Sequence, residues 1–318
     1  MAPMAEEARP IVEAPELEPE TGPGIAEVLE VESPRLPARR GPGADELREQ
    51  LPGLEPERRV TDWGRSERLE NLTDRTIVDF LYRYWFRVEV QGIENVPAEG
   101  GALLVSNHAG ALPPDAPMIA KAIKEEHPRP RPVHVTVEHF FKGYPGFAML
   151  LPKIGAVPAH PANVHRLLYD EGQLVVVLPE GRKGTEKLVK DRYRLRRFGR
   201  GGFVEAAMRA QAPIVPIALL GAEEAAPIFA HIGVLRRLTG FLYFPITPTF
   251  PHFGIPGMLG YLPAKFVIRF LPPIPTDQWG EESWLDRGLV QEVAGDVRDR
   301  IQRNVLDMLA QRKSVWLG

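Results

Sequence analysis

The chain has 318 residues, 44% of them hydrophobic, and a formal net charge of −3, so it can bury a substantial core and is not a generally basic nucleic-acid binder. It contains no cysteine, which excludes disulfides, thiolate metal ligands and a cysteine nucleophile. Residues 1–60 hold 14 acidic residues and seven arginines, are rich in proline and glutamate, and contain few aromatic residues. We therefore predict a disordered acidic tail over 1–60 and a folded domain over 61–318.

Beyond the tail, helical and strand-like patterns alternate. Residues 74–88 have apolar side chains at helical spacing, with Asp74 placed to cap the start. Strand-like runs follow at 102–106, 133–137, 174–178, 214–219 and 265–271, and helical patterns at 115–124, 161–170 and 203–210. Apolar residues at four-residue steps predict an amphipathic closing helix over 286–312. The alternation predicts an α/β fold with a mixed, largely parallel central sheet flanked by helices.

No segment is predicted to cross a membrane. The N-terminus lacks the basic and apolar regions of a secretory signal. The longest uncharged run, between Arg237 and Lys265, is interrupted by five prolines, which remove backbone donors that a lipid-exposed helix needs. We interpret this run as an irregular apolar segment that touches a membrane surface without spanning it.

Polar residues follow the strand predicted at 102–106. Asn107 and His108 lie at its carboxyl end, the edge where ligands bind in open α/β sheets. Asp115 begins a helix after a turn rich in glycine and proline, so its carboxylate could return to the imidazole and stabilise it as a proton acceptor. The same spacing also fits an Asp115 that only caps its own helix beside a surface histidine.

A second polar turn follows the strand predicted at 174–178. Glu180 and Gly181 come first, and Arg182 and Lys183 follow on a glycine-flanked loop suited to an anion. Residues 182–200 hold nine basic and two acidic residues, a local positive patch that favours phosphate groups or anionic lipid headgroups. A solvated charged loop is the alternative. Aromatic residues are sparse in this run and no nucleic-acid motif is visible, so we expect no nucleic-acid partner.

Several other chemistries do not fit the residues present. None of the five serines lies in a Gly-x-Ser-x-Gly motif, and no phosphate-binding loop ends in Gly-Lys-Ser/Thr. His134 and His139 would point to opposite faces of a strand, so we expect no metal site. What remains is a histidine base without a serine partner, beside a phosphate-attracting loop. That combination suits a transfer reaction in which a substrate hydroxyl is the nucleophile.

Four blocks occur in an order and spacing that resemble the glycerophospholipid acyltransferase family, which includes the lysophosphatidate and glycerol-3-phosphate acyltransferases. They are residues 88–97, Ser106-Asn107-His108 with Asp115, Leu178-Pro179-Glu180-Gly181, and Pro213 to Ile217. The resemblance covers roughly residues 74–275 and implies a glycerol-3-phosphate acyltransferase-like fold.

The resemblance also implies roles for individual residues. His108 would deprotonate the acceptor hydroxyl, and Asp115 would orient and stabilise the imidazole. The residues implied in substrate binding are Asn107, Glu180 and Gly181 for the acceptor, Arg182 or Lys183 for a phosphate, and Pro216 for the acyl side.

The implied reaction needs two lipid substrates and no resident cofactor or metal. The donor would be an acyl thioester, acyl-CoA or acyl-ACP, and the acceptor a glycerolipid or lysophospholipid. Because long acyl chains reside in bilayers, we expect a peripheral protein on the cytoplasmic face of the membrane. The basic patch and apolar segments such as 140–151 or 241–262 would flank one face. A non-catalytic lipid-binding protein on the same scaffold, and a hydrolase that uses water as acceptor, are the alternatives.

Three departures from the family pattern bear on the substrate. Six residues separate His108 from Asp115 where four are usual, which resembles the branch with monoacylglycerol- and diacylglycerol-acyltransferase-like members and points to neutral or glycolipid acceptors. Arg182 directly follows Gly181, and Lys183 takes the usual arginine position. The position that usually carries an acceptor-binding arginine holds Ala159 or His160, with Arg166 as the next available cation.

Overall fold

The computed structural model describes residues 61, 63–110, 114–138, 145–199, 201–233, 244–280 and 282–318. The tail predicted over 1–60 lies outside these residues, as do His139 and parts of the apolar segments 140–151 and 241–262. The predicted division into tail and domain therefore stays a prediction.

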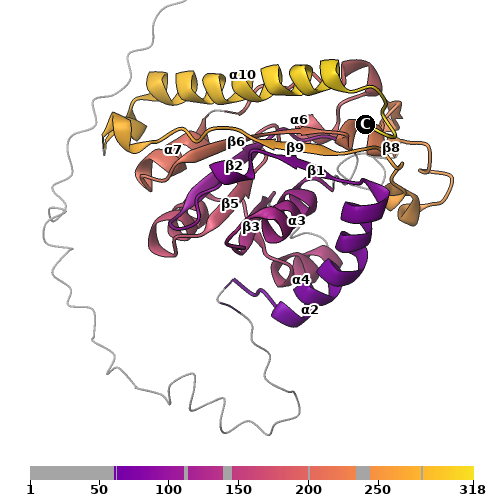
Figure 1. Ribbon diagram of the computed structural model, residues 1–318, viewed down its shortest axis with the longest axis horizontal. Helices are drawn as coiled ribbons and strands as arrows, with labels where there is room; N and C mark the ends of the chain where they lie inside the picture. The colour runs from indigo at the N-terminus through magenta and orange to yellow at the C-terminus, as the bar shows by residue number, and fades with distance from the viewer. Residues whose placement is uncertain are drawn as a thin grey trace, which may run out of the picture. The chain divides into compact units, whose positions relative to one another are not determined.

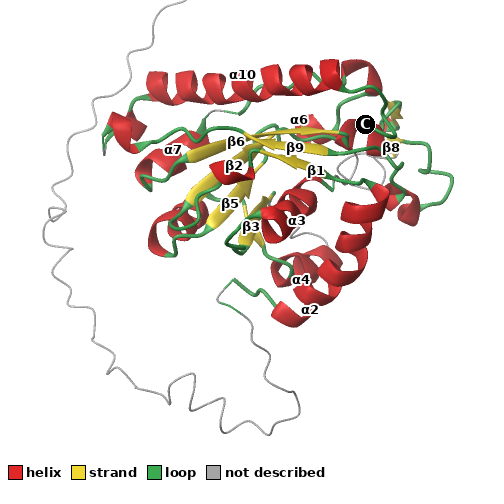
Figure 2. Ribbon diagram, in the orientation of Figure 1, coloured by secondary structure: helices red, strands yellow, loops and turns green. Residues whose placement is uncertain are grey.

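A seven-stranded sheet forms the centre of the domain, in the order β1-β9-β6-β2-β5-β3-β4 (Figures 1 and 2). Every neighbouring pair is parallel except β6 and β9, which are antiparallel. The strands are β1 (Glu89–Gln91), β2 (Ala102–Ser106), β3 (Val133–Val137), β4 (Ala156–Pro158), β5 (Leu174–Val177), β6 (Ile214–Leu220) and β9 (Val267–Phe270). A separate two-stranded sheet pairs β7 (Ala230–His231) with β8 (Pro245–Ile246). The prediction of a mixed, largely parallel sheet is confirmed.

Helices cover both faces of this sheet (Figure 2). The helices are α2 (Glu67–Thr73), α3 (Asp115–Glu126), α4 (Pro145–Lys153), α5 (Pro161–His165), α6 (Arg182–Thr185), α7 (Gly202–Arg209), α8 (Ala222–Ala225) and α10 (Arg287–Gln311). Two π-helical segments, η1 (Asp74–Val78) and η2 (Leu81–Trp85), continue α2, and a third, η5 (Arg166–Asp170), continues α5. Short 3₁₀ turns are η3 (Ile93–Asn95), η6 (Val189–Asp191), η7 (Ile255–Leu259), η8 (Asp277–Trp279) and η9 (Ser283–Leu285).

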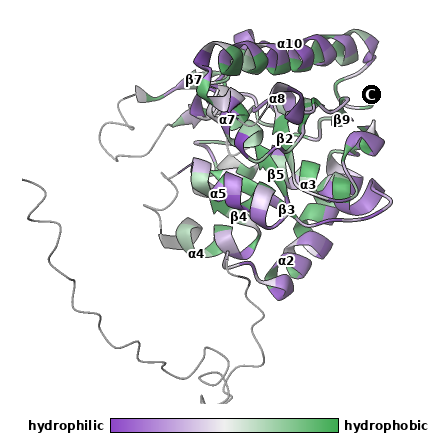
Figure 3. Ribbon diagram, turned by 90° about the vertical axis from the view of Figure 1, so that its left-hand side faces the viewer, coloured by the Kyte–Doolittle hydropathy of each residue, from purple (hydrophilic) through white to green (hydrophobic). Residues whose placement is uncertain are grey.

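The core has two layers because side chains alternate across the buried strands. In β2, Leu103 and Val105 pack in the layer with α7 and α10, whereas Ala102 and Leu104 pack in the layer with α3. The strands β2 and β5 are predominantly hydrophobic in Figure 3, while hydrophilic residues alternate with hydrophobic ones along α10. No helix in the described part of the chain is long and apolar enough to span a bilayer.

The first helix begins earlier than the sequence pattern predicted. α2 starts at Glu67, and Asp74 lies inside the helical run, so the prediction that Asp74 caps the helix is wrong. The Asp74 carboxylate instead lies 2.9 Å from Lys124 Nζ. The closing helix does have an aspartate cap, because Asp286 Oδ1 accepts from the backbone N–H of Gly288 at 2.8 Å.

Candidate active site

Asn107 joins two strands at the edge of the sheet where β2 ends. Its side-chain amide donates to the carbonyl of Leu219 at 2.9 Å, and its Oδ1 accepts from the Leu219 N–H at 2.9 Å. The residue is 4% exposed. This reciprocal pair fixes the end of β2 to β6, and so sets the position from which the next residue, His108, projects.

His108 and Asp115 are in hydrogen-bonding contact. The imidazole Nδ1 lies 2.9 Å from Asp115 Oδ2, which also accepts from the backbone N–H of Ala109 at 3.1 Å. The Asp115 side chain is 1% exposed and that of His108 is 15% exposed. Asp115 is the first residue of α3 and does not cap that helix. An ionised carboxylate can only accept, so Nδ1 carries the proton of a neutral ring and Nε2 is left as the basic nitrogen.

Glu180 holds the backbone of His108 from the other side. Its Oε1 accepts from the His108 N–H at 3.0 Å, and its Oε2 accepts from the Arg196 N–H at 2.7 Å. Its side chain has no exposed surface. Sequence reasoning assigned this carboxylate to acceptor binding. In the structure both of its oxygens already accept from backbone N–H groups, one of them that of His108.

Lys187 lies between the carboxylates of Glu180 and Glu223. Its ammonium lies 3.3 Å from Glu180 Oε2 and 2.7 Å from Glu223 Oε1, and its side chain is 2% exposed. Burial disfavours the ammonium form, but the attraction of Glu223 and Glu180 outweighs it, so the pKa of Lys187 is raised. Sequence reasoning counted Lys187 only as one member of the basic run, because nothing in the pattern separates a buried lysine from exposed neighbours.

Two glycines let the following turn pack against the histidine. Gly181 has a φ of +52°, and a Cβ there would lie 2.8 Å from Glu138 Oε1. A Cβ on Gly184 would lie 2.8 Å from the carbonyl oxygen of His108 and 2.9 Å from its Cβ. Sequence reasoning did not single out Gly184, whose only signal was its place in the glycine-flanked loop.

The predicted anion-binding residues lie on this turn. Arg182 and Lys183 are exposed and immediately precede Gly184, which packs on His108. The Arg182 guanidinium lies 3.3 Å from Glu186. Further along the basic run, the side chains that reach solvent are those of Lys190, Arg192, Arg194, Arg196 and Arg197.

Pro216 and Arg166 lie away from the two polar turns. Pro216 is buried in β6, in register with Val105 of β2, and so lies inside the sheet rather than on the polar turns. The Arg166 guanidinium lies 2.9 Å from Glu171 and 4.9 Å from the centre of the Trp63 ring. Glu171 precedes β5, so these contacts hold Arg166 near the edge where that strand begins, opposite the edge with His108.

Comparison with known proteins identifies the family of this chain. The model of the acyltransferase family matches residues 87–220. An uncharacterized protein of Mycobacterium tuberculosis is 40% identical over 272 residues, which cover 86% of this chain and 75% of the relative. A human protein named as a DGAT1/2-independent enzyme synthesizing storage lipids is 28% identical over 244 residues, 76% of this chain and 70% of the relative. The chicken protein of the same name is 31% identical over 216 residues, 68% of this chain and 59% of the relative.

Among solved structures, the 1-acyl-sn-glycerophosphate acyltransferase PlsC from Thermotoga maritima matches with a TM-score of 0.47 and 18% identity, covering 78% of this chain and 84% of that chain. The matched family segment runs from just before β1 to the end of β6 and contains both polar turns. The chain belongs to the acyltransferase family.

Proposed function

We propose that this protein transfers a fatty acyl group from an acyl thioester, acyl-CoA or acyl-ACP, to a hydroxyl of a glycerolipid or lysophospholipid. The 2.9 Å contact between His108 Nδ1 and Asp115 Oδ2 carries this proposal. It leaves Nε2 of a partly exposed imidazole as the base, and the chain offers no cysteine and no serine in a nucleophile motif as an alternative.

The proposed reaction proceeds in one displacement without an acyl-enzyme. His108 Nε2 takes the proton of the acceptor hydroxyl while its oxygen attacks the thioester carbonyl. The tetrahedral intermediate collapses, the C–S bond breaks, and the imidazolium returns the proton to the leaving thiolate. The products are an ester and a free thiol. Asp115 stabilises the positive charge that the ring carries between these two proton transfers.

Glu180 serves this reaction as a positioning residue rather than by touching substrate. Its buried carboxylate accepts from the backbone N–H of His108, and the ammonium of Lys187 lies 3.3 Å from the same carboxylate. Arg182 and Lys183 are the cations that would meet a phosphate on acceptor or donor, because the turn that carries them packs on His108.

The acceptor we favour is a neutral glycerolipid. The six-residue spacing between His108 and Asp115 resembles the monoacylglycerol- and diacylglycerol-acyltransferase-like branch, and relatives are named for the synthesis of storage lipids. We also propose that the protein works at the cytoplasmic face of a membrane, where acyl thioesters are available to a peripheral enzyme.

The test uses purified full-length protein with acyl-CoA or acyl-ACP and a panel of lysophospholipids, monoacylglycerols and diacylglycerols. We expect His108→Ala to lower acyl transfer by about 10²-fold or more. His165→Ala, on α5, is the matched control. Transfer that survives His108→Ala unchanged would rule out the assigned base. Lipid binding by the wild type without turnover of any pair would favour the non-catalytic alternative.

A further inference from the structure

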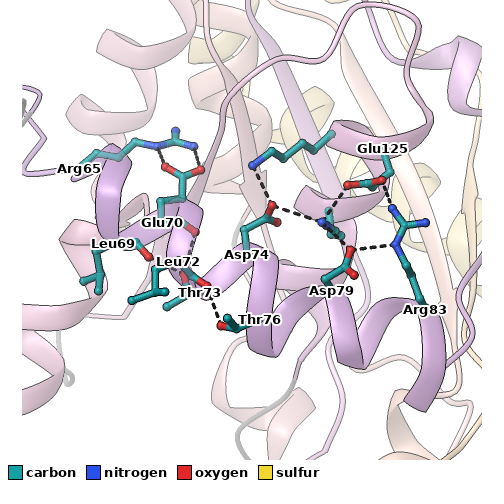
Figure 4. Close-up of polar contacts among 12 residues, drawn as sticks. Arg65, Leu69, Glu70, Leu72, Thr73, Asp74, Thr76, Asp79, Arg83 and Glu125 are labelled. Carbon is teal, nitrogen blue, oxygen red and sulfur yellow. Dashed lines mark hydrogen bonds and ion pairs between the residues drawn. The ribbon is translucent and has the colours of Figure 1, made fainter.

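The helical segment from Glu67 to Trp85 turns its central carboxylates towards the protein. Asp74 lies 2.9 Å from Lys124 and 3.3 Å from Lys121, and Asp79 lies 3.1 Å from Lys121. In Figure 4 dashed lines run from the labelled carboxylates of Asp74 and Asp79 to amine nitrogens, in keeping with these distances. The Lys121 side chain is only 3% exposed, so this face of the segment packs closely against α3.

The remaining acidic contacts of this segment are also made with cations of the protein. Glu70 lies 2.5 Å from Arg65, and Asp79 also lies 2.9 Å from Arg83, which contacts Glu125 of α3 (Figure 4). The hydrogen bond and attraction from Arg83 and Lys121 lower the pKa of Asp79. The three acids between residues 70 and 79 are therefore all neutralised by cations of the protein itself.

The solvent-exposed side chains of the segment include large apolar residues and arginines. Its large apolar side chains, here called the outer stripe, are Leu72 (59% exposed), Ile77 (64%), Phe80 (51%) and Tyr84 (69%). Arg68 and Arg75 are exposed at neighbouring positions, and neither has an ion-pair partner within the described ranges. Monomeric soluble proteins usually expose large apolar side chains singly, whereas four of them lie between residues 72 and 84 of this segment.

The end of the outer stripe lies at the edge of the sheet that carries His108. Trp85 Nε1 donates to the carbonyl of Tyr261 at 3.0 Å, and the next residue, Leu262, donates its N–H to Ala225 at 2.7 Å. Ala225 belongs to α8, which follows the carboxyl end of β6. These contacts bring the stripe to the side of the domain on which the proposed reaction takes place.

A second exposed apolar element lies beside the start of this segment. The backbone N–H of Ser66 donates to the carbonyl of Lys153 at the end of α4, at 3.0 Å. Figure 1 shows α2 and α4 side by side. In α4, Met149 is 66% exposed and Leu150 is 43% exposed. The helix α4 thus adds exposed apolar side chains close to the start of the segment.

We propose that the outer stripe, flanked by Arg68 and Arg75, is the surface by which the protein lies on an anionic lipid bilayer. Apolar side chains would enter the boundary between headgroups and acyl chains, and the two guanidinium groups would meet lipid phosphates. This deepens the proposed function by naming its lipid-contacting surface, and it rests on that function only for the lipid nature of the substrates.

Charge favours a bilayer over a second copy of the chain. In a two-fold dimer the same patch faces itself, so Arg68 and Arg75 of one copy would lie near those of the other. Of the acids in the segment, Glu70, Asp74 and Asp79 pair with cations of the protein, and Glu67, beside Arg68, is the one exposed acid, so the exposed side keeps a net positive charge. An anionic bilayer supplies the missing negative charge, whereas a second copy adds more positive charge.

The experiment is flotation of the protein with phosphatidylcholine vesicles that contain either no phosphatidylglycerol or about 30% of it, enough anionic lipid to give a negative surface potential that attracts basic residues. We expect binding to the anionic vesicles. The double substitution Ile77→Glu with Phe80→Glu should lower the partition coefficient by about tenfold or more, because it removes two apolar anchors and adds charge. Leu306→Glu, at a 49% exposed position of α10, is the matched control and should bind like wild type.

A second variant tests the electrostatic part without altering the apolar stripe. Arg68→Gln with Arg75→Gln should weaken binding to anionic vesicles by about fivefold for each arginine and leave binding to neutral vesicles unchanged. Circular dichroism and the melting temperature confirm folding of each variant. Acyl transfer with short-chain, water-soluble substrates should be unchanged in the Ile77/Phe80 variant, which separates this proposal from the assignment of His108.

Three results would overturn the assigned surface: no flotation of the wild type, equal flotation of the Ile77/Phe80 variant and the Leu306 control, or a dimer in sedimentation velocity that the Ile77/Phe80 substitutions dissociate. The last result would assign the stripe to a second copy of the chain.

Discussion

Substituting Asp115 by asparagine tests whether the buried carboxylate stabilises a charged His108. The contact is 2.9 Å from Nδ1 to Oδ2, and the carboxylate is 1% exposed, so the two charge centres would be about 4 Å apart with little water between them. At an effective dielectric constant of about 20, opposite charges at that separation attract by about 4 kcal/mol. Because the imidazolium of the proposed reaction forms only between its two proton transfers, Asp115→Asn should lower kcat by about 10³-fold.

The Michaelis constants should change little, because Asp115 is buried and is not proposed to touch substrate. Stability should fall by about 1–3 kcal/mol, since Asp115 Oδ1 has no hydrogen-bond partner among the described residues and an amide in its place leaves a buried polar group unpaired. The assay is steady-state acyl transfer below the melting temperature of the variant. Asp170→Asn, at an exposed position, is the control. A folded Asp115→Asn protein within about threefold of wild-type kcat would refute the electrostatic role.

Two further predictions concern Gly184 and His134. In Gly184→Ala the new methyl would lie 2.8 Å from the carbonyl oxygen of His108, so the histidine must shift, and we expect kcat to fall by about 10²-fold. Gly295→Ala, where a methyl meets nothing within 4 Å, should keep full activity in the same assay, and equal activities of the two variants would contradict the packing argument. Burial lowers the pKa of His134 to about 4 from an unfolded value of 6.5, so the folded state resists protonation and stability is lost as the pH falls from about 6.5 towards 4. Chemical denaturation from pH 7 to pH 4 should show this loss, at most about 3 kcal/mol, in the wild type and not in His134→Asn, and an identical pH dependence of the two proteins would argue against it.

Where the fold could be predicted, the local pattern and the tertiary environment agree. The strands at 102–106 and 174–178 are continuous apolar runs, as a strand covered on both faces requires, and the structure buries all five residues of β2. The first helix was misplaced by seven residues because Asp74 is a good cap by type. Its carboxylate is used instead by Lys121 and Lys124, partners about fifty positions away that no local pattern reveals.

The candidate site, too, could be predicted only where its contacts are local in the sequence. His108 and Asp115 could be paired from their places around one turn, because a strand end and a helix start are close in sequence and in space. The role of Glu180 could not be read from its motif, because it depends on the backbone N–H of Arg196 and on Lys187, which the fold brings together. Sequence spacing identifies side chains at the ends of strands, but burial and tertiary contacts decide which of these side chains remain available to a ligand.

The unusual distance between His108 and Asp115 in the sequence need not alter the geometry of the pair. Asp115 Oδ2 accepts from the Ala109 N–H at 3.1 Å as well as from the imidazole, so the carboxylate is fixed to the residue next to the histidine. Glu180 fixes the His108 N–H itself at 3.0 Å. These two anchors depend on the end of β2 and on the turn after β5, and not on the number of residues between the histidine and the aspartate. The proposed base and its carboxylate can therefore keep their contact whatever the number of residues between them.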